Sequence, residues 1–321
     1  MILAVALAAF AWSALTRVER SAVLGLYLLS ITFHSTHLLL AVALLPLAVL
    51  LPVAGDGRAP RAMRLAVPIM AAVVLLLAAS WLGFGRLTLT PQGAPFLLAR
   101  SWEDGPARAY LEATCPGAGW AICPQIGRLA GTAQDFLWRP DDSYWSMDLQ
   151  TRAAVRAEEL GILLPALAHD PWRQVTAMLT NGAMQLGQLG LDDLVLGRGA
   201  AVTPEDYTFV YQPSAPAAVW GVTGFSVVIY LTVAVALGGL LVWTGRTRAP
   251  IGDPVLACVL LVLAALILNA AICGALSGIH PRYQSRVVWL LPLLAAGLLA
   301  RPAAAVTAAH GAPEPPAPGS P

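Results

Sequence analysis

Long apolar runs, broken at short intervals by polar residues, occupy both ends of the chain. A transmembrane helix needs about 20 mostly apolar residues, and the pattern predicts about seven of them. The run over residues 21–52 is too long for one helix and has polar residues near its middle, so we expect two short helices joined there. The expected segments are 1–15, two within 21–52, 65–84, 218–243, 254–276 and 287–300.

The central residues show a different pattern, in which apolar positions recur at a helical period opposite Arg and Glu. This periodicity predicts a helix over Leu149–Leu167. Asp170-Pro171 is typical of an N-cap followed by proline in the first turn, and predicts a second helix over Trp172–Leu189. Each helix has one apolar face, which we expect either to pack on the other helix or to lie on the bilayer surface.

These elements predict an all-α fold: a polytopic transmembrane helix bundle with a mostly helical extracytoplasmic domain. We expect membrane helices over 1–84, with breaks near 16–20, 34–37 and 55–64, and again over 218–301. The extracytoplasmic domain takes up 85–217. Residues 302–321 form a tail rich in proline and alanine, which we expect to be disordered.

Composition supports a membrane protein and excludes two other classes. The chain of 321 residues is 58% hydrophobic and only 12% charged, whereas soluble domains carry about 25% charged residues. The formal net charge of +1 argues against a nucleic-acid partner. Fourteen of the 18 acidic residues lie between Arg86 and Ala217, which marks this segment as the part exposed to water.

Arginine in the short connections predicts the orientation. The connections 16–20, 55–64 and 244–253 carry Arg, and Arg301 follows the last expected helix. By the positive-inside rule these sites face the cytoplasm, so seven crossings give an N-out, C-in protein of the bacterial inner membrane. The first apolar run lacks the basic start and the cleavage site of a signal peptide. We expect either a reverse signal anchor or a chain whose true N-terminus lies upstream.

Two cysteines of the central segment, Cys115 and Cys123, stand eight positions apart. An extracytoplasmic location favours a disulfide between them. Two free buried thiols are the alternative. A zinc site would need further ligands, and His169 is the only histidine in the segment. We therefore expect no metal site there.

Acidic and aromatic side chains alternate over residues 134–142, where Asp135, Asp141 and Asp142 accompany Phe136 and Trp138. One interpretation is a site for a sugar or a cation, because aromatic faces and carboxylates together suit such ligands. The other is a capped turn with buried aromatic rings.

Two polar stretches at the expected outer membrane boundary are the strongest candidates for a binding site. His34 and His37 lie in the turn at 34–37, and residues 277–286 add His280, Arg282 and Arg286. Arginines placed against the usual charge bias point to function, and their guanidinium groups suit a lipid phosphate or pyrophosphate. Alternatively, the arginines extend toward lipid headgroups and the histidines cap helix ends.

The segments FHSTHLLLAVALLPLAVLL and HPRYQSRVVWLLPLLA, together with the large extracytoplasmic segment, resemble the GT-C superfamily. The similarity extends to uncharacterised bacterial inner-membrane proteins with a similar turn. GT-C proteins are polytopic glycosyltransferases that use polyprenyl-phosphate sugars. The resemblance implies that Arg282 and Tyr283, with Arg286 and His280 beside them, bind the lipid phosphate.

The sequence departs from that family at the catalytic acid, which GT-C enzymes carry in a first external loop that is missing here. Asp135, Asp141 and Asp142 are weak candidates for a base, without support from the family pattern. No cofactor is predicted. A divalent metal is compatible with a transferase, but no ligand set is identifiable.

Our first hypothesis for function is transfer of a glycosyl group from a polyprenyl-phosphate-linked donor on the periplasmic face. The expected partners are membrane lipids and this donor. The alternative is a non-catalytic membrane protein whose outer domain recruits an unidentified partner for envelope assembly. A transporter is third, because no paired ionisable residues lie in the middle of any expected helix.

Overall fold

The computed structural model describes residues 1–53, 57–90, 93–192, 198–199, 211–212 and 216–299. The regular elements within these ranges are helices, apart from one antiparallel pair of two-residue strands, β1 (Arg198–Gly199) and β2 (Tyr211–Gln212). The all-α class is therefore confirmed. The expected tail over 302–321 lies outside the described residues.

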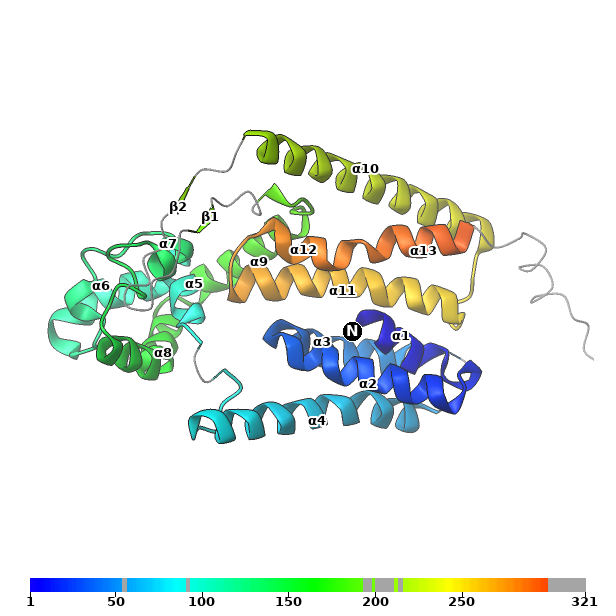
Figure 1. Cartoon of the computed structure of the whole chain (residues 1–321), viewed down its shortest axis with the longest axis horizontal. Coiled ribbons are helices and arrows are strands. Elements are labelled where there is room, and N and C mark those ends of the chain that lie inside the picture. The colour runs from blue at the N-terminus through cyan, green and yellow to red at the C-terminus, as the bar shows by residue number, and fades with distance from the viewer. Residues whose placement is uncertain (54–56, 91–92, 193–197, 200–210, 213–215, 300–321) are drawn as a thin grey trace, which may run out of the picture.

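A bundle of helices forms the larger part of the molecule, and its members run side by side along the long axis (Figure 1). Their apolar side chains share one core. The bundle consists of α1 (Ile2–Phe10), the 3-10 turn η1 (Trp12–Ala14), α2 (Arg17–Phe33), α3 (Ser35–Leu50), α4 (Arg58–Phe84), α10 (Pro216–Thr247), α11 (Pro254–Leu276), α12 (Pro281–Val288) and α13 (Leu290–Leu299).

Local sequence signals set several of these boundaries. The Thr16 side chain accepts from the backbone N–H of Glu19, and the Glu19 carboxylate accepts from the N–H of Thr16 in return, so a capping box starts α2. His34 has an extended backbone and separates α2 from α3. Asp253 caps α11 by accepting from the N–H groups of Val255 and Leu256.

Three of the described helices are long and apolar enough to cross a membrane, which corrects the expected seven and indicates a multi-pass membrane protein. The three are Arg58–Phe84, Gly221–Thr247 within α10, and Pro254–Leu276. The other expected spans are too short. Nine-residue α1 rises only about 14 Å against a hydrocarbon core about 30 Å thick. The capping box at Thr16 and the break at His34 limit α2 to 17 residues.

The last expected span and the loop before it also differ from the prediction. Residues 281–286, expected as part of a loop, form most of α12, which ends at Val288, and a break at Trp289 separates this helix from α13. Pro281 in the first turn explains why α12 starts here, because the backbone N–H that proline lacks would have no intrahelical hydrogen-bond partner at this position. Arg282 and Arg286 consequently lie one helical turn apart.

A second, smaller unit lies at one end of the bundle (Figure 1), and we call it the outer domain. Its apolar core, which includes Leu98, Trp102 and Phe136, is separate from that of the bundle. It consists of α5 (Phe96–Asp104), α6 (Pro106–Ala118), the 3-10 turn η2 (Cys123–Gln125), α7 (Ala133–Trp138) and α8 (Leu149–His169).

Buried Glu159 of α8 fixes the start of α5. Its carboxylate accepts from the backbone N–H groups of Leu97 and Leu98, at 3.1 and 3.2 Å, and pairs with Arg156. Helix N-terminal N–H groups have no intrahelical partner, so a carboxylate is well placed there. Burial nevertheless raises the pKa of Glu159 above its usual value, against the opposite influence of Arg156.

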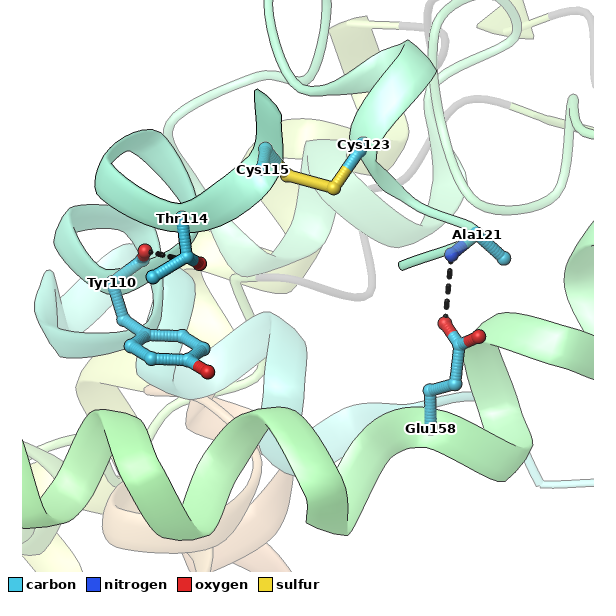
Figure 2. The surroundings of a disulfide bond; sticks show 6 residues. All are labelled: Tyr110, Thr114, Cys115, Ala121, Cys123 and Glu158. Carbon is cyan, nitrogen blue, oxygen red and sulfur yellow. Dashed lines mark hydrogen bonds between the residues drawn. A yellow bond between two sulfur atoms is a disulfide. The ribbon is translucent and has the colours of Figure 1, made fainter. Parts of the chain in front are cut away.

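A disulfide links Cys115 of α6 to Cys123 of η2, with their Cα atoms 5.1 Å apart (Figure 2). In the same loop the backbone N–H of Ala121 donates to the Glu158 carboxylate of α8 at 2.8 Å. The turn after α6 is thereby tied to one helix covalently and to another by a charge-assisted hydrogen bond.

Helix α9 (Pro171–Leu186) begins beside the outer domain and packs mainly against α11 of the bundle. The Asp170 side chain caps it, and proline occupies the first turn, as predicted. Of the two arrangements expected for α8 and α9, packing of the two helices on each other is only a minor contact, because α8 packs mainly on α6 and α5.

Candidate functional site

A cavity of about 600 Å³ lies where the outer domain meets the bundle. The loop 277–280 and α12 provide part of its lining, α5 and α7 provide another part, and the turn between α2 and α3 contributes one residue. Its titratable and charged lining residues include His34, Arg100, Glu103, His280, Arg282 and Arg286.

Arg282 and Arg286 flank the Tyr283 ring. Each guanidinium carbon is 5.2 Å from the ring centroid, within range of a cation–π interaction. The Tyr283 hydroxyl is hydrogen-bonded to Ser277 at 3.0 Å, which fixes the ring. Among the described residues, no hydrogen bond or ion pair involves the Arg286 guanidinium, so its five donors are available to a ligand.

Neighbouring helices hold residues 280–286, which we call the cationic segment, in place through side-chain amides. Gln185 of α9 makes two hydrogen bonds with the backbone of His280: its Nε2 donates to the carbonyl at 2.9 Å, and its Oε1 accepts from the N–H at 2.7 Å. Asn269 of α11 donates to the carbonyl of Tyr283 at 3.0 Å and to Gln284 Oε1 at 2.8 Å. The start of α12 is therefore fixed from two sides.

The part of the lining from α5 contains an ion-pair network. Arg100 donates to Asp104 and lies 3.3 Å from the Glu103 carboxylate. Oε2 of Glu103 also accepts from the N–H of Ala133 at the start of α7, at 2.8 Å. Arg100 is thus neutralised within the protein, while Glu103 remains partly exposed and lines the cavity.

The local charge balance favours an anion. Counted over the described residues at or beside the cavity, three guanidinium groups (Arg100, Arg282, Arg286) and two carboxylates (Glu103, Asp104) give a formal charge of +1 before any histidine is protonated. Such a charge in a partly enclosed site is stronger than at an open surface, because less water screens it.

His34 lies at the boundary between α2 and α3, where its Nδ1 atom is 2.7 Å from the Thr36 hydroxyl. Burial lowers its pKa below the usual value, and the nearby charges of Arg286 and His37 act in the same direction. His34 is therefore mainly neutral at neutral pH and gains charge only in acid.

The structure brings together all four residues proposed for lipid-phosphate binding and one of the two turn histidines. His34, His280, Arg282, Tyr283 and Arg286 line the one cavity. His37 lies beside it, with Nδ1 bonded to the Ser30 carbonyl at 2.7 Å.

The three proposed aspartates do not line this cavity. Asp135 lies in the first turn of α7, and Asp142 pairs with Arg139 at 3.6 Å. The backbone carbonyl of Asp141 accepts from the same arginine at 3.2 Å. Within the described residues, no group of three His, Cys, Asp or Glu side chains is arranged to hold a metal ion.

Sequence reasoning missed Arg100 and Glu103. They are three positions apart on α5, and therefore share one face of this helix. That spacing was visible in the sequence, but nothing local indicated that α5 packs near the distant α12 segment.

A second cavity of about 330 Å³ adjoins the first and shares Arg286 with it. Its other lining is mainly apolar and comes from α1, α2, α3 and the junction of α12 with α13, with Phe33, Leu40 and Trp289 among the residues. A cationic cavity therefore lies beside an apolar one, with Arg286 in both.

No protein-family model matches the chain, and no curated protein or solved structure shows a significant match. The resemblance to the GT-C superfamily therefore remains a prediction from the residues quoted above.

Proposed function

We propose that this protein is a GT-C-like glycosyltransferase of the bacterial inner membrane, which takes its sugar from a polyprenyl-phosphate-linked donor on the periplasmic face. The observation that carries the proposal is the pair of adjoining cavities that share Arg286. A donor of this class is an amphiphile, with an anionic phosphate between a polar sugar and an apolar chain. The pair of cavities matches that order.

The sizes and charges of the cavities support this assignment. About 600 Å³ is within the usual range for small-molecule sites, roughly 300–1,000 Å³, and accommodates a sugar phosphate. Arg282 and Arg286 would hold the phosphate, because guanidinium groups bind its oxygens in a bidentate manner. The apolar cavity beside Trp289 and Phe33 would take the first part of the polyprenyl chain.

Glu103 supplies the base in this proposal, in place of the three aspartates outside the cavity. Its carboxylate would accept the proton of the acceptor hydroxyl as that oxygen bonds to the anomeric carbon of the sugar. The bond from that carbon to the phosphate oxygen breaks, and the phosphate leaves with its electron pair, held by Arg282 and Arg286. General-base catalysis of this kind contributes about 10²–10⁴-fold.

The periplasmic location is part of the proposal. The disulfide in the outer domain is typical of an oxidising compartment. Arginine gathers at the opposite end of the bundle, where Arg20 and Arg64 lie over Trp12. Both features favour an outer domain on the extracytoplasmic side.

The alternative, a non-catalytic protein whose outer domain recruits a partner, draws support from the separate core of that domain. It requires no ligand in the cavity. The two proposals therefore differ in what they predict for the cavity residues.

The deciding experiment measures binding of a polyprenyl phosphate to the full chain in lipid nanodiscs. Loss of one charge-assisted interaction costs about 1.5–3 kcal/mol, so Arg286→Ala should weaken binding by roughly 10- to 100-fold. Arg282→Ala should act in the same direction. Arg128→Ala is the matched control, an exposed arginine of the outer domain that does not line the cavity.

A Glu103→Gln variant separates binding from transfer. It should bind the polyprenyl phosphate as the parent does, while the rate of glycosyl transfer from the donor falls by about 10²–10⁴-fold. Unchanged binding in both arginine variants, with the protein correctly inserted, would refute the proposed site and favour the non-catalytic alternative.

A further inference from the structure

Helix α9 has the opposite arrangement of polar and apolar side chains from a helix in a soluble domain. Its polar residues Gln174, Asn181 and Gln185 are 7%, 6% and 0% exposed, whereas Trp172 and Leu179 are 76% and 69% exposed. In water this arrangement is unfavourable, since large apolar side chains lose free energy by exposure. In a bilayer it is the expected one, because polar side chains face the protein and apolar ones face lipid.

The buried polar side chains of α9 are all satisfied by protein partners. Asn181 and Gln174 each donate to the Asp104 carboxylate at 2.9 Å, and Gln185 binds the backbone of His280. From Val175 to Leu191 the chain contains no charged residue. The segment thus has the composition of membrane-embedded chain, although polar side chains lower its hydropathy.

Small residues bring α9 into close contact with a candidate transmembrane helix. A Cβ atom on Gly274 of α11 would lie 2.5 Å from the carbonyl oxygen of Asn181, and one on Gly182 would lie 3.3 Å from the Cα of Ala271. Backbone contact of this kind through small residues is characteristic of helix pairs in membranes.

The chain after α9 turns back while still beside α10. The Tyr230 hydroxyl donates to the carbonyl of Gly187 at 2.9 Å and accepts from the N–H of Leu189 at 3.1 Å. The Ser226 hydroxyl accepts from the N–H of Leu191 at 2.8 Å. Non-helical backbone is tolerated at membrane depth only where protein satisfies its polar groups, and here two side chains of α10 do so.

These contacts set the depth of the turn. Tyr230 lies nine residues beyond Gly221, where the candidate span of α10 begins, which corresponds to about 13 Å along the helix axis. The span is 27 residues long, about 40 Å, and exceeds the hydrocarbon core of about 30 Å by roughly 5 Å at each end. Residue 230 therefore falls inside the hydrocarbon.

We propose that α9 and the turn over 187–191 form a re-entrant segment, which enters the bilayer from the side of the outer domain and returns to that side. Its exposed face, with Trp172 near the membrane surface and Leu179 and Leu186 deeper, contacts the acyl chains of that leaflet. Trp172 suits the interface because its ring is amphipathic. This placement is independent of the proposed transfer reaction.

The placement of α9 in the bilayer also concerns the support of the cavity. Gln185, which fixes the backbone of His280, lies on the protein-facing side of the same helix. A helix embedded in lipid thus forms part of the support of the cationic segment.

The test uses nitroxide labels on the full chain in phospholipid vesicles. Cys258 and Cys273, the free cysteines, are replaced by alanine, and the disulfide is kept. Single cysteines then replace Leu179 or Leu186. Leu231→Cys on α10 is the lipid-facing control, and Glu112→Cys on α6 is the water-facing one; both positions are exposed in the structure.

The measurement is the collision rate of each label with oxygen, which partitions into lipid, relative to a water-soluble nickel chelate. We expect the ratio at positions 179 and 186 to be several-fold higher than at position 112 and to approach that at position 231, with 186 deeper than 179. Ratios at 179 and 186 equal to that at 112, while 231 gives the lipid value, would overturn the proposal. Thermal unfolding of each labelled protein verifies that the fold is retained.

Discussion

Replacement of Gly274 by alanine tests the contact between α9 and α11 directly. The added Cβ would lie 2.5 Å from the oxygen and 2.7 Å from the carbon of the Asn181 carbonyl, and 2.9 Å from the nitrogen of Gly182. All three atoms belong to the backbone, so no side-chain rotation relieves the overlap. Ordinary van der Waals contact begins near 3.4 Å, and the two helices must therefore separate by roughly 0.9 Å.

The expected cost follows from two opposing effects. Overpacking of a well-packed site costs about 1–3 kcal/mol, and the upper end applies because both sides are backbone. Alanine regains about 1 kcal/mol over glycine in a helix interior. The net effect is a loss of about 2 kcal/mol in the free energy of unfolding.

Gly238→Ala is the matched control. Gly238 lies within α10, and no atom lies within 4 Å of an added Cβ. Only the helix-propensity gain applies there, so this variant should be unchanged or up to about 1 kcal/mol more stable. The free energy of unfolding is measured by titration with a denaturing detergent in mixed micelles, with tryptophan fluorescence as the signal.

Binding gives a second, independent measurement. A 0.9 Å displacement of α9 lengthens the two hydrogen bonds of 2.9 and 2.7 Å between Gln185 and His280. Gly274→Ala should therefore also weaken binding of a polyprenyl phosphate, whereas Gly238→Ala should not. If Gly274→Ala is as stable as Gly238→Ala and binds equally well, the contact between α9 and α11 does not exist as described.

Two further predictions concern the charges near the cavity. Asp104→Ala removes the main partner of Arg100, which is almost completely buried, and should lower the free energy of unfolding by on the order of 3–5 kcal/mol. The control Glu112→Ala breaks the exposed pair with Arg108 and should lower it by at most about 1 kcal/mol. Equal effects of the two variants would contradict the buried network. Burial lowers the pKa of His34 below about 6.5, so this side chain becomes a cation only as pH falls below that value. Phosphate-lipid affinity should therefore rise from neutral pH to about pH 5 more steeply in the parent than in His34→Ala, and identical pH profiles would remove His34 from the site.

Much of the helical structure could be predicted from the sequence, because its signals are local. The helix at Pro254–Leu276 begins where the apolar run predicts and the helix from Leu149 begins where the helical periodicity predicts, and an Asp side chain caps each one. Helix α9 follows the Asp-Pro start at 170–171. The number of membrane helices was overestimated, because hydropathy is also a local signal. Hydropathy reports how apolar a run is, but breaks at Phe10 and Trp289 shorten the actual helices.

The position of α9 could not be predicted, although its start could. Its sequence mixes Gln, Asn and Thr with Leu and Met, which fits an amphipathic helix in water as well as one in lipid. The difference lies in which face the neighbours cover. That depends on Gly274, which is 92 residues from Gly182 and is recognised as a contact only once α11 lies against α9.

By itself the sequence determined that this chain is helical, belongs in a membrane, and gathers its acids in one segment, because hydropathy, capping and charge act over a few residues. It also singled out Arg282 and Arg286. Only the tertiary structure decided that these arginines share a cavity with His34, Arg100 and Glu103, because residues up to about 250 positions apart meet through packing of the outer domain on the bundle. The same packing excluded the three aspartates from that cavity.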